Sequence, residues 1–165
     1  MEEFSVEATC KCDFVFLAVS GDFALEHAEK IAAAGAIVVD NSSAFRYMDR
    51  VPLVVPEINA SAIGESKLIA NPNCTTAIAA VALWPLHQRF GIKKLIMSTY
   101  QAASGAGAEG MEELLEGTRE KLSGKEPGHS VFAHPLPFNL IPHIDNFQVC
   151  LLTPSPPSCK LMRVL

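Results

Sequence analysis

The chain has 165 residues, of which 49% are hydrophobic and 19% charged, and its formal net charge at pH 7 is −5. It is too apolar and too weakly charged for a disordered protein, and a mildly acidic balance without a basic run argues against nucleic acid or anionic membranes as partners. No apolar run reaches the roughly 20 residues of a spanning helix, and the acidic start lacks the apolar core of a secretory signal. The five cysteines are an odd number, which favours a reducing compartment over a disulfide framework.

The first half of the sequence predicts a strand, a helix and a second strand. Residues 14–19 are a continuous apolar run, as expected of a strand buried on both faces. A helix capped by Asp22 should follow and end at Gly35. Its expected core face consists of Phe23, Leu25, Ala28, Ile31 and Ala32. Residues 36–39 predict a second buried strand, and a βαβ unit of this length implies a parallel sheet.

Shorter elements follow. Residues 51–56 predict a short strand bracketed by prolines, residues 59–64 one or two helical turns, and residues 68–70 another short strand. An alanine-rich helix is expected over 75–90, and Pro85 inside it should produce a kink.

The second half is less regular. Residues 92–100 alternate in part and predict a strand with one wetter face, followed by a small-residue loop over 101–110. A helix is expected over 108–122, with four apolar residues on one face: Met111, Leu114, Leu115 and Leu122. Residues 123–146 are rich in proline and histidine and should be irregular. The final segment, 149–165, follows neither a helical nor a strand period.

Cys74 is the strongest candidate for chemistry. It lies in the segment Asn-Pro-Asn-Cys-Thr-Thr, at or just before the start of the helix predicted over 75–90. Free N–H groups at a helix N-terminus favour a thiolate and could also bind an oxyanion on a carbonyl carbon that the sulfur attacks. The alternative is a buried packing cysteine, which is common for this residue type.

Polar and small residues follow several predicted strands, where ligands bind in doubly wound sheets. Arg46 could pair with a phosphate or carboxylate, or be a solvated surface charge. Gln101 could hydrogen-bond a carbonyl substrate, or stabilise a turn. The turns 20–21 and 104–107 allow close backbone approach to a ligand, or serve as ordinary connections. None of the five histidines has a metal-ligand spacing, so no metal site is predicted.

These segments together resemble the aspartate-semialdehyde dehydrogenase family. The resemblance rests on VVDNSSAFR at 38–46, VPEIN at 55–59, LIANPNCTT at 68–76, STYQAASGAG at 98–107, and PFN with IP near 137–142. It extends from about residue 13 to residue 147. The acetylglutamyl-phosphate reductases share the chemistry and the general fold but have a different flank around their nucleophile.

The resemblance implies a function and residue roles. Enzymes of this family interconvert aspartyl phosphate and aspartate semialdehyde with NADP, on the route to lysine, threonine and methionine, as homodimers or homotetramers in the cytoplasm or plastid stroma. Cys74 matches the nucleophile that forms a thioester. Gln101, Arg46 and Asn73 match substrate-binding positions. The expected cofactor contacts are Ser20, Gly21, Asn41, Ser42, Ser104 and Gly105.

The sequence also departs from the family pattern. The glycine-rich phosphate loop that opens the family is absent, and so is the later segment that carries its acid/base histidine and its substrate-carboxylate arginine. The alternatives are therefore a truncated, inactive form or a non-catalytic partner of a full-length subunit. We expect an α/β fold, with an incomplete Rossmann-type parallel-sheet domain over 1–73. Part of an α+β catalytic and dimerisation domain follows over 74–148, and the tail over 149–165 is off the pattern.

Overall fold

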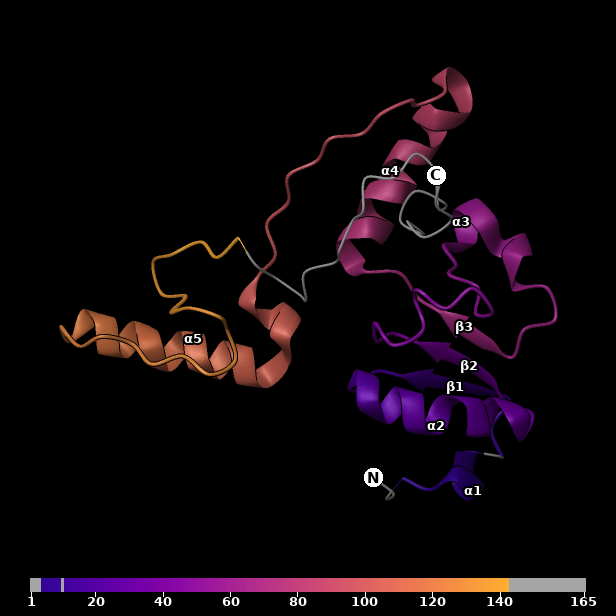
Figure 1. Ribbon diagram of the computed structural model, residues 1–165, viewed down its shortest axis with the longest axis horizontal. Coiled ribbons are helices and arrows are strands. Elements are labelled where there is room, and N and C mark those ends of the chain that lie inside the picture. Colours follow the sequence, from indigo (N-terminus) through magenta and orange to yellow (C-terminus); the bar gives the residue numbers. More distant parts are fainter. Residues whose placement is uncertain (1–3, 10, 143–165) are drawn as a thin grey trace. The chain divides into compact units, whose positions relative to one another are not determined.

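The computed structural model describes residues 4–9 and 11–142, which form two compact units that meet in the chain between Ile96 and Met97 (Figure 1). The first unit contains α1 (Val6–Thr9), β1 (Phe14–Leu17), α2 (Gly21–Ala33), β2 (Ile37–Asp40), α3 (Pro56–Asn59), the 3₁₀ turn η1 (Ala60–Ile63), β3 (Leu68–Ala70) and α4 (Cys74–Phe90). The second contains the 3₁₀ turn η2 (Ala103–Ala106) and α5 (Gly107–Leu122). The tail predicted over 149–165 lies outside the described residues.

The first unit is built on a parallel sheet with strand order β1-β2-β3, which confirms the predicted βαβ unit (Figure 1). Phe14 pairs with Ile37, and Val38 pairs with Leu68. The sheet packs against α2, and Val38 on the central strand is fully buried. Because all three strands run in one direction, their carboxyl ends lie at one edge of the sheet, where the segments carrying the predicted site residues of the first unit begin.

Helix α2 begins two residues earlier than predicted. Ser20, and not Asp22, caps it, since the Ser20 hydroxyl accepts a hydrogen bond from the Phe23 N–H at 3.3 Å. Starting the helix at Gly21 places Ala24, Ala28 and Ile31 on the buried face. Leu25, predicted to be in the core, is 49% exposed because it falls on a different face of this helix. Gly35 ends the helix as predicted, with a φ of +116°.

Strand β1 is not buried on both faces. Phe14 and Phe16 are 60% and 76% exposed, whereas Leu17 is buried in the core. Side chains alternate across a strand, so Leu17 belongs to the face that α2 covers and Phe16 to the opposite face. Within the described residues no helix covers that opposite face at β1, which is an edge strand.

The strand predicted over 51–56 is reduced to an isolated bridge between Leu53 and Ala70. Two hydrogen bonds hold it: the Val54 N–H donates to the Ala70 carbonyl, and the Ala70 N–H donates to the Pro52 carbonyl. Proline has no N–H to continue a ladder, which limits the pairing to this length. The second bracketing proline, Pro56, instead starts α3.

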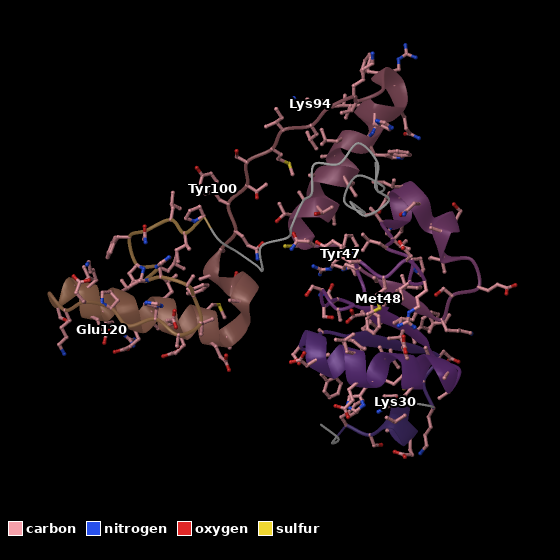
Figure 2. All side chains as sticks on the ribbon, in the orientation of Figure 1. Lys30, Tyr47, Met48, Lys94, Tyr100 and Glu120 are labelled. Atoms are coloured by element: carbon pink, nitrogen blue, oxygen red, sulfur yellow. The ribbon has the colours of Figure 1, made fainter. Side chains whose placement is uncertain are left out.

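The structure has no strand over residues 92–100, so that prediction is wrong. These residues have no regular secondary structure, and nearly all of them are exposed, including Lys94 and Tyr100 (Figure 2). A strand needs a hydrogen-bonding partner, and no part of the chain that the structure describes pairs with this segment. Its first residue is tied to the end of α4, where the Ile92 N–H donates to His87 Nδ1 at 3.2 Å.

The second unit consists of α5 with the irregular segment 123–142 packed along it (Figure 1). The helix is confirmed, but three members of its predicted apolar face, Met111, Leu115 and Leu122, are about half exposed or more. Two glycines are buried instead. A Cβ on Gly117 would lie 2.9 Å from the Pro137 ring. The glycine therefore permits close packing in the middle of a helix.

One carboxylate of α5 holds this irregular segment. Glu113 accepts hydrogen bonds from the Ser130 N–H and hydroxyl, the Val131 N–H and the Phe132 N–H, at 2.6 to 3.2 Å. Burial of the Glu113 carboxyl favours its neutral form, but these donors outweigh that effect and lower its pKa from 4.5 to about 2. Glu113 is therefore ionised over the whole physiological range.

Candidate active site at the carboxyl edge of the sheet

Cys74 is the first residue of α4, and Asn73 caps that helix. The Asn73 side-chain oxygen accepts a hydrogen bond from the Thr75 N–H at 3.0 Å. The Cys74 sulfur is exposed and lies 3.9 Å from both Asn73 Oδ1 and Thr75 Oγ1. The structure therefore places Cys74 at a helix N-terminus, as predicted from the sequence, and the alternative of a buried packing cysteine does not hold.

Arg46 is held by two backbone carbonyls at the ends of two strands. Its Nε donates to the Asn71 carbonyl at 2.9 Å, and its Nη2 donates to the Asn41 carbonyl at 2.8 Å. The two asparagines are also joined, since Asn71 Nδ2 donates to Asn41 Oδ1 at 2.5 Å. Arg46 is half-buried and fixed in place, so it is not a freely solvated surface charge.

Asn71 was not among the residues singled out from the sequence. One signal could have identified it: Asn71 directly follows β3, as Asn41 directly follows β2. Backbone hydrogen bonds continue the sheet through both residues, because the Asn71 N–H donates to the Asp40 carbonyl and the Asn41 N–H donates to the Leu17 carbonyl. The two side chains therefore emerge next to each other.

Asp40 and Ser42 shape the turn that leads to Arg46. Asp40 is fully buried and accepts hydrogen bonds from the Ser42 N–H at 3.2 Å and from the Ser42 hydroxyl at 2.8 Å. The Ser42 hydroxyl in turn accepts from the Ala44 N–H at 3.2 Å. Sequence reasoning proposed Ser42 as a cofactor contact and did not assign a role to Asp40. In the structure both residues serve the local turn.

Ser20 and Gly21 lie at the same edge, between β1 and α2. Ser20 is exposed and caps α2, which leaves the first N–H groups of that helix at the carboxyl edge of the sheet. A Cβ on Gly21 would make only an ordinary 3.9 Å contact with Ala44. Crowding by the protein itself therefore does not require a glycine at this position.

The remaining predicted residues belong to the second unit. Gln101 and Gly105 are in contact, because a Cβ on Gly105 would overlap the end of the Gln101 side chain and lie 3.1 Å from its Cδ. Ser104 is exposed within η2, and its carbonyl accepts a hydrogen bond from the Gly107 N–H. The structure thus brings a predicted substrate residue and a predicted cofactor residue together on one turn.

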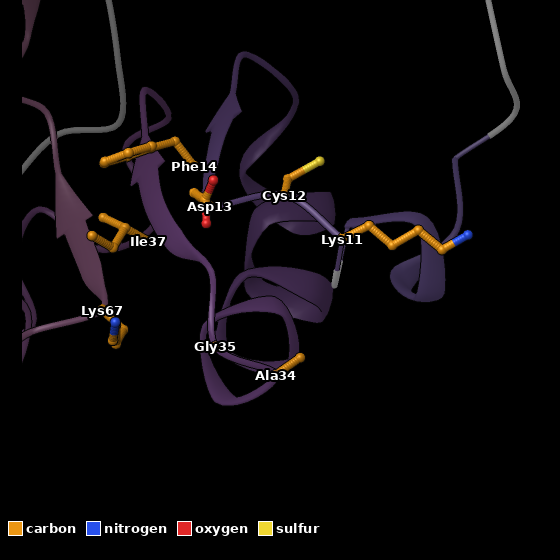
Figure 3. Close-up of a pocket in the computed structure, with 8 residues that line it drawn as sticks. All are labelled: Lys11, Cys12, Asp13, Phe14, Ala34, Gly35, Ile37 and Lys67. Carbon is orange, nitrogen blue, oxygen red and sulfur yellow. The ribbon is translucent and has the colours of Figure 1, made fainter.

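A separate hollow of about 350 Å³ lies at the opposite, amino-terminal edge of the sheet (Figure 3). Its lining includes Lys11, Cys12, Asp13 and Lys67, and none of the predicted site residues. Within residues 4–9 and 11–142, no group of three or more His, Cys, Asp or Glu side chains could hold a metal ion. No helix in that part of the chain is long and apolar enough to cross a membrane.

Comparisons with known proteins agree with this architecture. Residues 1–66 match the model of the semialdehyde dehydrogenase NAD-binding domain, and residues 83–149 match that of the semialdehyde dehydrogenase dimerisation domain. Aspartate-semialdehyde dehydrogenase of Synechocystis is 51% identical over 80% of this chain and 39% of its own length. That of Aquifex aeolicus is 43% identical over 88% of this chain and 46% of its own length.

A solved structure supports the same assignment. Aspartate semialdehyde dehydrogenase II of Vibrio cholerae, complexed with ASA, matches 89% of this chain and 44% of its own, with a TM-score of 0.81 and 37% identity. The chain spans less than half the length of each of these relatives. Both halves of the chain, in sequence and in fold, show that it belongs to the semialdehyde dehydrogenase family of oxidoreductases and is similar to aspartate-semialdehyde dehydrogenases.

Proposed function

We propose that this chain carries the nucleophile and the anion-binding edge of an NADP-dependent, phosphorylating aspartate-semialdehyde dehydrogenase. The observation that carries the proposal is the placement of Cys74: an exposed thiol at the capped N-terminus of a long helix, in the same unit as the fixed arginine Arg46. The substrate pair is aspartyl phosphate and aspartate semialdehyde. The reaction belongs to the biosynthesis of lysine, threonine and methionine.

The first half-reaction follows from the chain's own residues. The Cys74 thiolate attacks the acyl carbon of aspartyl phosphate, the bond from that carbon to the phosphate oxygen breaks, and inorganic phosphate leaves behind a thioester. The N–H groups at the start of α4 stabilise the oxyanion that forms during the attack. Arg46 binds the phosphate, because a guanidinium matches the geometry of phosphate oxygens.

The cofactor-binding part of the proposal rests on α2. The exposed start of this helix fits a dinucleotide phosphate, since free N–H groups and the positive end of the helix dipole favour an anion there. Ser20, Gly21, Asn41 and Ser42 would hold that part of the cofactor. A bound nicotinamide supplies the hydride that converts the thioester to the aldehyde. NADP as the cofactor follows from the family resemblance.

Gln101, Ser104 and Gly105 complete the proposal. Gln101 would orient the substrate, and Ser104 with Gly105 would contact the cofactor. Asn73 would orient the substrate beside Cys74. We further propose a domain division at residues 73 and 74, a homodimer or homotetramer, supported by the match to a dimerisation-domain model, and a location in the cytoplasm or plastid stroma.

The acyl-transfer step can be tested without the cofactor. The purified chain is incubated with aspartyl phosphate, and its cysteine-containing peptides are analysed by mass spectrometry. We expect one aspartyl group on Cys74, with release of phosphate, and no modification after Cys74→Ser. Acylation of another cysteine first would contradict the proposed nucleophile. NADP- and phosphate-dependent oxidation of aspartate semialdehyde then tests the complete reaction.

A second candidate function is that of a non-catalytic partner of a full-length subunit. One observation favours it: residues 92–100 fall within the match to the dimerisation-domain model, yet they are exposed and unpaired in the described chain. Mixing the chain with the full-length Synechocystis enzyme, followed by size-exclusion chromatography, should then give a stable complex. Separate elution of the two proteins would remove this candidate.

A further inference from the structure

We infer that Asn71 is a positioning residue. It holds Arg46 in place to bind an anionic group of the substrate near the thiol of Cys74. The inference rests on the proposed function and adds to it a residue outside the predicted site. Asn71 does not itself need to touch the substrate. It acts through Arg46, whose Nε donates a hydrogen bond to the Asn71 carbonyl at the carboxyl edge of the sheet.

The three hydrogen bonds among Arg46, Asn41 and Asn71 form a closed ring. The guanidinium binds one carbonyl from each asparagine, and the amide of Asn71 binds the amide of Asn41. Each bond therefore limits the movement of the groups that make the other two. A guanidinium held at two points by a rigid ring loses less freedom when it binds an anion, which raises affinity.

The ring leaves Arg46 available to an anion. An arginine has five N–H donors, and the carbonyl contacts engage Nε and Nη2 only. Within residues 4–9 and 11–142, Nη1 has no hydrogen-bond partner. Both Nη1 donors and the second Nη2 donor therefore remain, and two neighbouring guanidinium nitrogens suit the two oxygens of a phosphate or carboxylate.

The same residue ties this arginine to the nucleophile. Asn71 is followed by the buried Pro72, by the capping residue Asn73 and by Cys74. Because a fully extended chain advances at most about 3.6 Å per residue, the Cα atoms of Asn71 and Cys74 are no more than about 11 Å apart. Proline also restricts the backbone of the residue before it. A change at Asn71 is thus expected to alter anion binding near the thiol.

Phosphate protection of Cys74 tests this inference. Iodoacetamide alkylation of Cys74 is followed by peptide mass spectrometry at increasing concentrations of inorganic phosphate. In the unchanged chain, phosphate should slow alkylation. Asn71→Ala should raise the concentration that gives half-protection by about fivefold, as expected for the loss of one hydrogen bond. Asn41→Ala should raise this concentration by a similar factor. The double variant should need no more phosphate for half-protection than either single variant, because both substitutions remove the same hydrogen bond.

Two controls separate the possible failures. Asn59→Ala removes two hydrogen bonds from the same unit, to Val55 and Leu53, but none from the ring. It should leave half-protection unchanged, and an equal loss of protection in this variant would overturn the inference by showing a general loss of structure. Arg46→Ala should abolish protection. If it does not, the proposed phosphate site is wrong; if it does while Asn71→Ala changes nothing, the inference about Asn71 alone is overturned.

Discussion

Replacement of Asn73 by aspartate separates two roles of this residue. Its Oδ1 caps α4 through the Thr75 N–H and also lies 3.9 Å from the Cys74 sulfur. Aspartate caps helices about as well as asparagine, and a carboxylate interacts favourably with the positive end of the helix dipole. The stability of α4 in Asn73→Asp should therefore be unchanged or slightly higher. The reactivity of the Cys74 thiol should fall, because the added carboxylate repels the thiolate.

The size of that change follows from the distance. Two negative charges 3.9 Å apart repel each other by about 1 kcal/mol in water, and the aqueous value applies because Cys74 is exposed. Alkylation proceeds through the thiolate, so the rate with iodoacetamide at neutral pH and low salt should fall by about fivefold. At 1 M salt the Debye length is about 3 Å, and most of the difference should disappear.

Asn73→Ala is the matched control. It removes the cap without adding a charge, and it should cost about 0.5–2 kcal/mol of helix stability. Its alkylation rate, relative to the unchanged chain, should be the same at low salt and at 1 M salt, whereas that of Asn73→Asp should rise with salt. A wild-type alkylation rate for Asn73→Asp at low salt, with helix content retained in circular dichroism, would refute the reasoning. It would mean that the side chain at position 73 does not face the thiol.

Three further outcomes are expected. The packing of residues 130–132 on Glu113 should be fully stable above about pH 4.5 and weaken as the pH falls towards 2, because the pKa of Glu113 is lowered to about 2; a midpoint near 4.5 in the NMR shifts of these amides would contradict this. Gly117→Ala should lower the midpoint of urea unfolding of α5. The gain of about 1 kcal/mol in helix propensity is smaller than the cost, about 1–3 kcal/mol, of a Cβ placed 2.9 Å from the ring of Pro137. Asp40→Ala should cost about 1–3 kcal/mol in thermal unfolding, since the N–H and the hydroxyl of the half-buried Ser42 lose their acceptor, and an unchanged melting temperature would show that the turn does not depend on it.

The parts of the fold that the sequence predicted are those in which local pattern and tertiary environment agree. The apolar runs of β1 and β2 and the alanine-rich run of α4 form the elements that their patterns predict. Residues 92–100 alternate in part, as in a strand, yet form no strand in the described chain. Whether a segment forms a strand depends on hydrogen bonding to a neighbouring strand, and the pattern of one segment does not show whether such a neighbour exists.

The site shows the same division. Cys74, Arg46 and Gln101 could be proposed as site residues from the sequence because their side chains have recognisable chemistry and lie beside predicted elements. Asn71 could not be proposed in this way, because its bond to Asn41 joins the ends of two strands, and a single sequence does not show which residues lie side by side across a sheet. The contact between Gln101 and Gly105 is possible because Gly105 has no side chain. The sequence does not show this contact, because it depends on the three-dimensional path of the turn.

The way in which Arg46 is held explains why it suits an anionic ligand. Its partners are neutral carbonyls, and within residues 4–9 and 11–142 it forms no ion pair with a carboxylate. The nearby carboxylate of Asp40 is buried and turned to Ser42. A carboxylate on Arg46 would cancel most of its charge, whereas carbonyls fix its geometry and leave the charge in place. The positive end of the α4 dipole beside Cys74 adds a second group that favours an anion at this edge of the sheet. That arrangement supports the proposed binding of an acyl phosphate at this edge and the proposed departure of phosphate from it.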